Sequence, residues 1–348
     1  MKALCFYEHG GLDVLRCDDV PDPEPGPGQV VVRVRACALN HLDTFVRQGW
    51  PGLKLEMPHW TGADVAGEIA SLGEGVTGCT HPRWQVGQRV VVEPGLSTRE
   101  DEFTCRGEHC LSPGYVILGE QLRGGHAEYV AVPAASLMPI PEGWDFALAS
   151  APLLVSLTAW RMLIHRAQLR AGESVLIVGA GGGVNSMAIQ IAKLAGATVY
   201  ALTSTEQKME KARGLGADVV LNYRQDPEWS KTLFKMTGRR GVDVVVDNVG
   251  RATLAQSMRA VARGGRIVIV GNTSGPQVEI DVRFIFSKQI SIIGSTMGTH
   301  QDFQDVMGLL WAGKLRPVVD RVMPLSEGKE AFALLERGDQ FGKIVLTP

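Results

Sequence analysis

Two cysteines and a histidine in the stretch FTCRGEHCLSP (103–113) have side chains that could bind a metal ion. Four residues separate Cys105 from Cys110, and His109 directly precedes the second cysteine. Zinc readily takes thiolate and imidazole ligands, and this spacing is allowed in a zinc loop. A structural zinc site needs four converging ligands, however, and the sequence offers no evident second pair. The stretch therefore indicates ordinary thiols, with a rearranged site of these three residues and another group as the alternative.

A glycine-rich loop could bind phosphate. GAGGGVN (179–185) follows a β-branched run and opens a segment of helical spacing. Glycines in this context let the backbone approach a pyrophosphate, whose charge faces the amides at the helix start. The G-x-G-x-x-G pattern is imperfect, because Val184 and Asn185 stand where a later glycine is expected. The alternative is a tight strand–helix turn that binds nothing, but strand, loop and helix all favour a dinucleotide site.

The residues after the second strand of this region bear on cofactor choice. A domain that binds NAD usually has an acidic residue there, which bonds the ribose 2′-hydroxyl. Here the strand ends in Thr203, Ser204 and Thr205, and Lys208 follows one helical turn later. Lys208 could pair with a 2′-phosphate, although it could also be a solvated helix lysine, and Glu206 opposes the interpretation unless it points to solvent. The pattern favours NADP(H) over NAD(H).

The surrounding segments predict two domains. From residue 173 onward, strand-like runs alternate with segments of helical spacing, which predicts βαβ units and a parallel sheet. We place this α/β domain at 151–295. The first half alternates apolar and polar residues between Gly- and Pro-rich breaks, which predicts a β-rich domain. Expected strands are 29–36, 64–72, 86–93, 125–132, 173–178, 197–204, 218–222, 242–250, 265–272 and 342–347, and expected helices are 185–196, 206–216, 228–237, 252–263 and 300–313.

The composition is that of an ordinary globular protein. The chain has 348 residues, 45% of them hydrophobic, and a net charge of −2, so nothing suggests nucleic acid or an anionic membrane surface as a partner. No apolar run is long enough for a signal peptide or a membrane span. The six cysteines are dispersed in a long chain, which predicts free thiols in a reducing cytoplasm. They are Cys5, Cys17, Cys37, Cys79, Cys105 and Cys110.

Read as a whole, the chain resembles the medium-chain dehydrogenase/reductase superfamily, in particular its quinone-reductase-like and alcohol-dehydrogenase-like members. The resemblance covers nearly the whole chain, because several motifs occur in the right order. It implies a Rossmann domain with a doubly wound parallel sheet at 151–295, and a β-rich GroES-like catalytic domain at 1–150 that is completed by 296–348. The motifs are VRACALNHLDTFVRQG (34–49), TGADVAGEIASLGEGV (61–76), LTAW (157–160), the glycine loop, NYR (222–224), GNTSG (271–275) and FGKIVL (341–346).

The resemblance also bears on metals. Relatives with a structural zinc carry four cysteines before a segment like YVILGE (115–120), and the corresponding positions here are Thr98, Asp101, Thr104 and Ser112. The catalytic metal of other relatives is bound by Cys, a His-Glu pair and Cys. These positions correspond to Asn40, Ala63 with Asp64, and Val155. Alanine and valine cannot ligate, and two oxygen ligands are a poor zinc set. We therefore expect no metal.

Without a metal, the substrate itself must spread the negative charge that hydride transfer creates. Quinones and α,β-unsaturated carbonyls do so, which agrees with the quinone-reductase resemblance. We expect an NADPH-dependent oxidoreductase acting on a small molecule such as a quinone, an enone or an aldehyde. One alternative is an alcohol dehydrogenase with a rearranged zinc site, and another is a non-catalytic NADPH-binding protein. The superfamily also implies a homodimer or homotetramer, with 287–298 as a possible joining edge or else an internal strand.

The resemblance implies a role for individual residues. Asn40, Asp43 and Asp64 would be catalytic, with a local turn hydrogen bond as the alternative for Asn40 and Asp43. Phe45 and Trp50 would bind the substrate ring, or belong to the core. Asn248 and Asn272 could instead cap turns, and Tyr223 could be a surface ring. The residues expected to bind the cofactor are Thr158, Gly179, Gly182, Gly183, Val184, Ser204, Lys208, Tyr223, Asn248, Gly271, Asn272 and Lys343.

Overall fold

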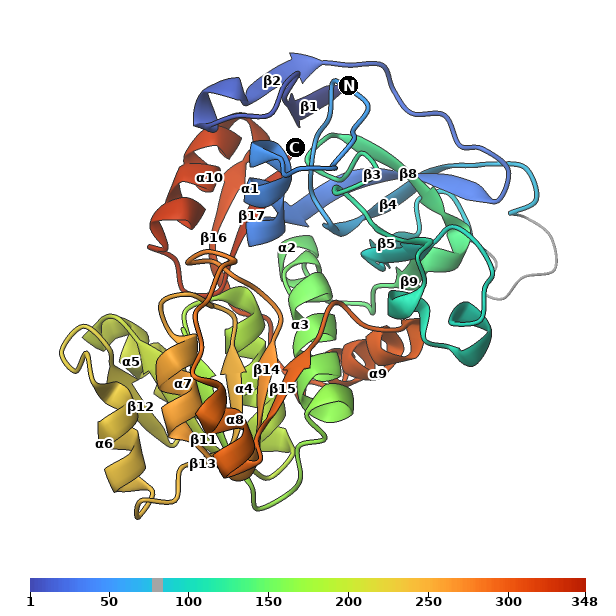
Figure 1. The fold of residues 1–348 in the computed structure, drawn as a ribbon. Helices are drawn as coiled ribbons and strands as arrows, with labels where there is room; N and C mark the ends of the chain where they lie inside the picture. The colour runs from blue at the N-terminus through green and yellow to red at the C-terminus, as the bar shows by residue number, and fades with distance from the viewer. Residues whose placement is uncertain (77–83) are drawn as a thin grey trace. The chain divides into compact units, whose positions relative to one another are not determined.

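The computed structural model describes residues 1–76 and 84–348, which form two compact units (Figure 1). The first unit consists of Met1–Leu154, Thr299–Met307 and Pro317–Pro348, and the second of Val155–Gly298 and Gly308–Arg316. Residues 308–316 were expected in the β-rich domain but belong to the second unit. There the Gln190 side chain bonds the Arg316 backbone at both its N–H and its carbonyl, at 3.0 and 3.1 Å. The expected free thiol Cys79 lies outside the described residues.

The first unit is built on a seven-stranded sheet with the order β16-β17-β3-β4-β5-β9, in which β8 also pairs with β3. The pairings are antiparallel, apart from the parallel pair β16–β17. Alternating valines of β3 point into one apolar core, as the period-2 pattern predicts, and Val65 and Ile69 of β4 join them. The strands of this unit are β1 Lys2–Cys5, β2 Arg16–Asp19, β3 Gln29–Ala38, β4 Asp64–Leu72, β5 Arg89–Val92, β6 Gly95–Ser97, β7 Tyr115–Ile117, β8 Tyr129–Pro133, β9 Leu137–Pro139, β16 Val319–Pro324 and β17 Lys343–Thr347.

Helices of the first unit pack around this sheet. Its helices are α1 His41–Gln48, α2 Phe146–Ser150 and α10 Gly328–Arg337, while α3 Leu153–Trp160 and α9 His300–Trp311 include residues of both units. The pair α1 and α10 contact each other, where the buried Arg47 of α1 forms an ion pair with Glu336 of α10 at 2.6 Å between Nη2 and Oε1. The sequence patterns predicted neither of these two helices.

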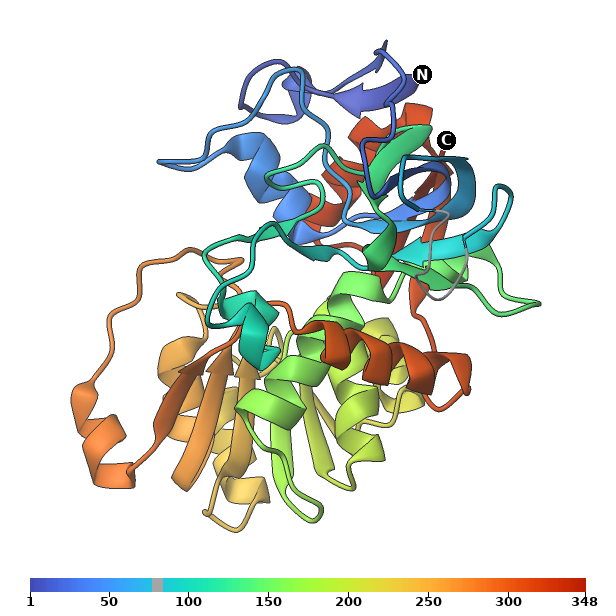
Figure 2. The same cartoon turned by 90° about the vertical axis from the view of Figure 1, so that its right-hand side faces the viewer.

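The second unit contains a six-stranded sheet with the order β12-β11-β10-β13-β14-β15 (Figure 2). Every pairing in it is parallel, which confirms the predicted doubly wound sheet. The topological switch lies between β10 and β13, because the chain winds outward in both directions from these two strands. The elements are β10 Ser174–Val178, β11 Thr198–Thr203, β12 Val219–Asn222, β13 Val242–Asp247, β14 Val261–Ile269, β15 Ser291–Gly294, α4 Gly183–Leu194, α5 Glu206–Gly214, α6 Trp229–Met236, α7 Leu254–Ala260 and α8 Val282–Lys288.

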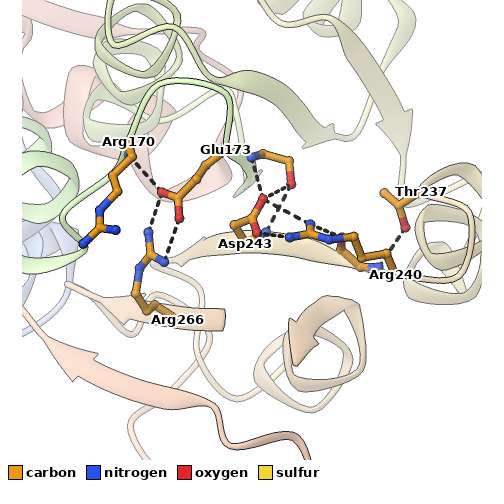
Figure 3. A network of polar contacts seen from close by, with 8 residues as sticks. Arg170, Glu173, Thr237, Arg240, Asp243 and Arg266 are labelled. Atoms are coloured by element: carbon orange, nitrogen blue, oxygen red, sulfur yellow. Dashed lines mark hydrogen bonds and ion pairs between the residues drawn. The ribbon is translucent and has the colours of Figure 1, made fainter. Parts of the chain in front are cut away.

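Charged residues connect three neighbouring strands of the second unit (Figure 3). The guanidinium of Arg266, in β14, donates to both carboxylate oxygens of Glu173 at 2.7 and 3.0 Å. Asp243, in β13, accepts from the backbone and hydroxyl of Ser174 and from Arg240. Burial raises the pKa of Asp243, but the hydrogen bonds from Arg240 and Ser174 outweigh burial and lower the pKa to about 2. Ionised groups therefore connect the amino ends of β10 and β13 with the middle of β14.

One helical stretch, Phe146–Arg166, is long and apolar enough to cross a membrane by length and composition alone. In the structure, 78% of its most apolar window is buried inside the protein. The stretch comprises α2, α3 and a π-helical turn at Arg161–Arg166, and it supplies core residues such as Leu157 and Met162. Its apolar character is therefore accounted for by packing inside the protein. The five described cysteines are free thiols.

Candidate functional site

The glycine loop lies between β10 and α4, as the sequence predicts. Gly179 ends the strand with φ +86°, a left-handed conformation that glycine adopts without steric cost. Gly182 is the N-cap of α4, and Gly183 and Val184 form its first turn. The first N–H groups of a helix have no partner within the helix, so these residues present donors to an anion. The predicted residues Gly179, Gly182, Gly183 and Val184 thus lie together in a loop that fits a pyrophosphate.

The expected adenosine end lies at the carboxyl ends of β11 and β12. Ser204 follows β11, and Thr205 caps α5 by accepting a hydrogen bond from the Lys208 backbone N–H at 3.2 Å. The Tyr223 backbone N–H donates to Thr203 at 3.0 Å, so Tyr223 lies beside the end of β11. Glu206 is exposed, and its carboxylate accepts from the Gln225 side chain at 3.4 Å. The acidic residue that opposed NADP(H) is therefore exposed and bonded to Gln225, two residues after Tyr223.

On the other side of β10, the turn after β13 and the loop after β14 are bound to each other. The carbonyl of Asn248 accepts from the Thr273 backbone at 3.3 Å, and that of Val249 accepts from the Ser274 backbone at 2.9 Å. A Cβ atom on Gly271 would lie 3.1 Å from the Asn248 carbonyl, so this close approach favours glycine. Asn272 adjoins Gly271 in the loop, and Thr158 is a buried residue of α3.

Asn248 offers a polar atom that fits a cofactor. Its side-chain Nδ2 donates to Oδ1 of Asn185 at 2.7 Å. Its own Oδ1 is buried, and no residue within 1–76 or 84–348 forms a hydrogen bond with it. A buried acceptor of this kind usually has a partner, so it fits a ligand hydroxyl or amide group. Asn185 was not among the residues expected to bind the cofactor, because the sequence pattern marked it only as a position where glycine is expected.

In the first unit, strand register gathers Asn40, Asp64 and Lys343. Ala38 of β3 pairs with Val345 of β17 on one side and with Asp64 of β4 on the other. Lys343, two residues before Val345, therefore lies across from Asn40. Its Nζ donates to Asp64 Oδ2 at 2.8 Å and also bonds Asn40 Oδ1. Lys343 was expected among the cofactor-binding residues, and the antiparallel register of the C-terminal strand places its ammonium group in this cluster.

The cluster is almost completely buried. Asp64 is 0% exposed and Lys343 is 3% exposed. The remaining bonds of the Asp64 carboxylate come from Asn40 Nδ2 at 2.9 Å and from the Leu154 backbone N–H at 2.7 Å. Burial raises the pKa of Asp64, while the Lys343 ammonium and the hydrogen bonds oppose that rise. Such a pair is stable in a dry interior only because nearly every polar atom has a partner.

The carboxylate of Asp43 forms local hydrogen bonds to the backbone. Its carboxylate accepts from the backbone N–H of Asn40 at 2.6 Å and from that of Gly62 at 3.0 Å. These bonds begin helix α1 and join it to the chain before β4, which is the local role that was kept as the alternative. Burial raises the pKa of Asp43 to about 6, against the lowering effect of these hydrogen bonds. Asp43 thus positions Asn40 through the backbone.

The expected substrate-binding rings lie in and after α1. Phe45 is half-buried within the helix, and Trp50 is 40% exposed just beyond it. Neither ring belongs to the apolar core cluster that contains Leu39 and Val46, although both neighbour it in sequence. The two rings are therefore candidates for contact with a flat ligand.

The side chains at the expected metal-binding positions do not offer a set of ligand atoms that fits zinc. The side-chain oxygens of Asn40 and Asp64 already bond the Lys343 ammonium, and Ala63 carries no donor. Across residues 1–76 and 84–348, no three His, Cys, Asp or Glu side chains gather as a metal site requires. Around the opening motif, Cys105 is exposed, whereas Cys110 is buried.

The four positions that correspond to structural-zinc cysteines form hydrogen bonds. Asp101 accepts from Ser112 Oγ at 2.5 Å and from the Thr104 backbone at 3.1 Å. Thr104 Oγ1 contacts the Asp101 backbone, and Thr98 Oγ1 donates to the Gly114 carbonyl at 2.8 Å. The hydrogen bond from Ser112 is the main reason that the pKa of Asp101 is lowered. These bonds connect residues across the loop at 98–114.

Comparison with known proteins agrees with both units. The family model described as alcohol dehydrogenase GroES-like domain matches residues 26–142, and the model described as zinc-binding dehydrogenase matches residues 183–312. The chain is 30% identical to a quinone oxidoreductase of Homo sapiens over 99% of this chain and 97% of that protein. It is 34% identical to an NAD-dependent alcohol dehydrogenase of Saccharolobus solfataricus over all of both chains.

A solved structure of an NAD-dependent alcohol dehydrogenase superposes with a TM-score of 0.95, at 43% identity and full coverage of both chains. Fold and site define an oxidoreductase with a dinucleotide-binding domain and a GroES-like domain. The chain belongs to the medium-chain dehydrogenase/reductase superfamily, as its motifs predicted.

Proposed function

We propose that the chain is an NADP(H)-dependent oxidoreductase that reduces quinones and α,β-unsaturated carbonyls without a metal ion. The observation that carries this proposal is the buried cluster of Asn40, Asp64 and Lys343, in which an ammonium group bonds the oxygens that a catalytic cation would need. When bound, the reduced nicotinamide supplies a hydride. The protein must then stabilise the substrate with hydrogen bonds alone.

Asn40 is the residue best suited to donate that hydrogen bond. One N–H of its amide is directed at Asp64, and the second remains for a substrate oxygen. The Lys343 ammonium, bonded to Oδ1, draws electron density from the amide and makes this N–H a stronger donor. Asp64 and Lys343 thereby act as positioning residues, since they fix the orientation of the Asn40 amide from both of its ends.

A single neutral donor suits substrates that delocalise charge. A simple aldehyde concentrates the developing charge on one oxygen, where a Lewis acid contributes several kcal/mol of stabilisation. A quinone or an enone spreads the charge into a phenolate or an enolate, so one amide N–H and solvent suffice. Phe45 and Trp50 would then stack on the flat acceptor.

The loop that fits the pyrophosphate and Asn248 support the cofactor assignment. Ser204, Lys208 and Tyr223 would hold the 2′-phosphate end, and Thr158, Gly271 and Asn272 the nicotinamide end. Two relatives are named NAD-dependent, so the preference for NADP(H) rests on this chain's own residues after β11. The free thiols agree with a reducing cytoplasm.

The test is oxidation of NADPH and NADH against a panel of quinones, enones, aldehydes and alcohols. The protein is first treated with a chelator, and its metal content is measured on the same sample. We expect turnover of quinones and enones by metal-free protein, with Asn40→Ala lowering kcat but not cofactor affinity. Turnover that appears only after zinc is restored would contradict the proposal.

The names of two relatives favour a second candidate, a zinc-type alcohol dehydrogenase with a rearranged metal site. In that case the panel would show alcohol oxidation that depends on zinc. A non-catalytic NADPH-binding protein would instead bind the cofactor without turning over any acceptor in the panel.

A further inference from the structure

Asn185 lies beside the glycine loop but is not among the residues expected to bind the cofactor. It is the third residue of α4 and only 4% exposed, although it stands where the dinucleotide pattern expects a glycine. Its Nδ2 lies 2.6 Å from the carbonyl oxygen of Val178 and 2.9 Å from that of Gly179. The side chain therefore bonds the end of β10 and the first residue of the glycine loop.

These two contacts fix the orientation of the Asn185 amide. Carbonyl oxygens accept only, so the group that faces Val178 and Gly179 must be the amide nitrogen. The Asn185 oxygen consequently faces the other way, toward Asn248, at 2.7 Å. The amide orientation follows from the backbone carbonyls, not from a choice between nearly identical atoms.

The same logic fixes Asn248. An acceptor at Asn185 Oδ1 requires a donor, so Asn248 must present its Nδ2 to Asn185 and its Oδ1 to the opposite side. Bonds from Thr273 to the Asn248 carbonyl hold its backbone as well. The orphaned acceptor at Asn248 Oδ1 is thus the end of a chain of hydrogen bonds that starts at the β10 backbone.

A buried acceptor-only oxygen selects its ligand group. It repels phosphate oxygens and pairs with a hydroxyl or an amide N–H. Asn248 follows β13, on the opposite side of β10 from β11, where the adenosine end is expected. Within a dinucleotide bound across this edge, the donor nearest to Asn248 belongs to the nicotinamide half.

We propose that Asn185 is a positioning residue for the cofactor: through its side chain it sets the amide of Asn248 so that the Asn248 oxygen accepts from a hydroxyl of the nicotinamide-side ribose. This inference rests on the proposed use of a nicotinamide dinucleotide and on no particular substrate. It predicts that Asn185 acts on cofactor affinity through Asn248 and not through the shape of the glycine loop.

The test is a double-mutant cycle measured by direct binding, without turnover. Asn185→Ala, Asn248→Ala and the double variant are titrated with NADPH, with NADH, and with adenosine 2′,5′-bisphosphate, which lacks the nicotinamide half. We expect each single variant to weaken dinucleotide binding about tenfold, the loss of one buried hydrogen bond. We expect the adenosine bisphosphate to bind all variants like wild type, and the double variant to bind no worse than Asn248→Ala.

Two outcomes would overturn the inference. If the two losses multiply in the double variant, Asn185 acts independently of Asn248. If Asn185→Ala weakens the adenosine bisphosphate as much as NADPH, Asn185 only shapes the loop. Asn185→Gly, with the residue that the pattern expects, provides the second variant if alanine prevents folding. Because binding is the readout, failure of the quinone and enone panel leaves this result interpretable, whereas failure of the dinucleotides to bind wild type would end both proposals.

Discussion

Lys343 is the residue whose removal should be most costly. Its ammonium is the counter-ion of the fully buried Asp64 carboxylate. We expect Lys343→Met to lower the free energy of unfolding by about 3 to 5 kcal/mol, because it leaves a buried charge without its partner. Urea unfolding checks this. The double variant Lys343→Met, Asp64→Asn should lose clearly less free energy of unfolding than Lys343→Met alone. If single and double variants lose the same, the buried ion pair is not what Lys343 contributes.

Lys208 should determine cofactor choice. It stands at the start of α5, after a strand that ends without a carboxylate. We expect Lys208→Glu to raise the Kd of NADPH about tenfold to a hundredfold, because a charge-assisted bond to the 2′-phosphate becomes a repulsion. The Kd of NADH should change little, as should both constants in the matched control Lys211→Glu on the same helix. Equal weakening of both cofactors by Lys208→Glu would count against NADP(H).

His59 should make stability depend on pH. Burial lowers its pKa to about 4, and its Nε2 lies 3.3 Å from the Gly119 carbonyl oxygen, to which it donates. The fold therefore favours the neutral ring, and stability present above the ordinary pKa of 6.5 is lost as pH falls through 6.5 toward 4. The difference between the pKa values of 6.5 and about 4 corresponds to about 3 kcal/mol of free energy of unfolding.

The variant His59→Gln retains a donor for Gly119 but does not titrate. As pH falls from 6.5 to 4, the free energy of unfolding of wild type should decrease by about 3 kcal/mol more than that of the variant. The difference between the two proteins is the measurement, because the raised pKa of Asp43 makes stability fall as pH rises from 3.8 to about 6, the opposite sign. Parallel curves for the two proteins would show that His59 does not titrate as described.

At the scale of the element, hydrogen bonds should hold the loop at 98–114 together without metal. Asp101 connects Thr104 and Ser112, and Thr98 bonds Gly114. We expect Asp101→Ala to speed amide hydrogen exchange in this loop roughly tenfold, because the variant lacks the carboxylate that accepts these hydrogen bonds. Exchange in β10 to β15 should not change, because the bonds are local to the loop. Chelator treatment of wild type is the control. Faster exchange after chelation, with Asp101→Ala unchanged, would indicate that a metal holds the loop.

The elements also show what the sequence could and could not predict. Continuous β-branched runs predicted β10 to within a residue, and the glycines at 179–183 predicted the loop between this strand and α4. Helix α1 was missed, because its eight residues are few and Asn40 and Asp43 were interpreted as catalytic residues or as a local turn. The contact of Lys343 with Asp64 joins residues 279 apart in sequence and depends on two strand registers. Local patterns contain no information about such pairings.

At the scale of the whole molecule, the free edge of the six-stranded sheet should join two copies of the chain. Strand β15 ends the sheet, and it carries Ile292, 37% exposed, six residues after the 68% exposed Phe286 of α8. An apolar edge with unpaired backbone groups is a template for pairing with another strand. We expect sedimentation velocity to show a dimer or tetramer for wild type, which Ile292→Lys weakens or abolishes by placing a charge in the interface.

The matched control is Val322→Lys, at a 51% exposed position of β16, the edge strand of the other sheet. A monomeric wild type, or dissociation by Val322→Lys and not by Ile292→Lys, would exclude β15 as the joining edge.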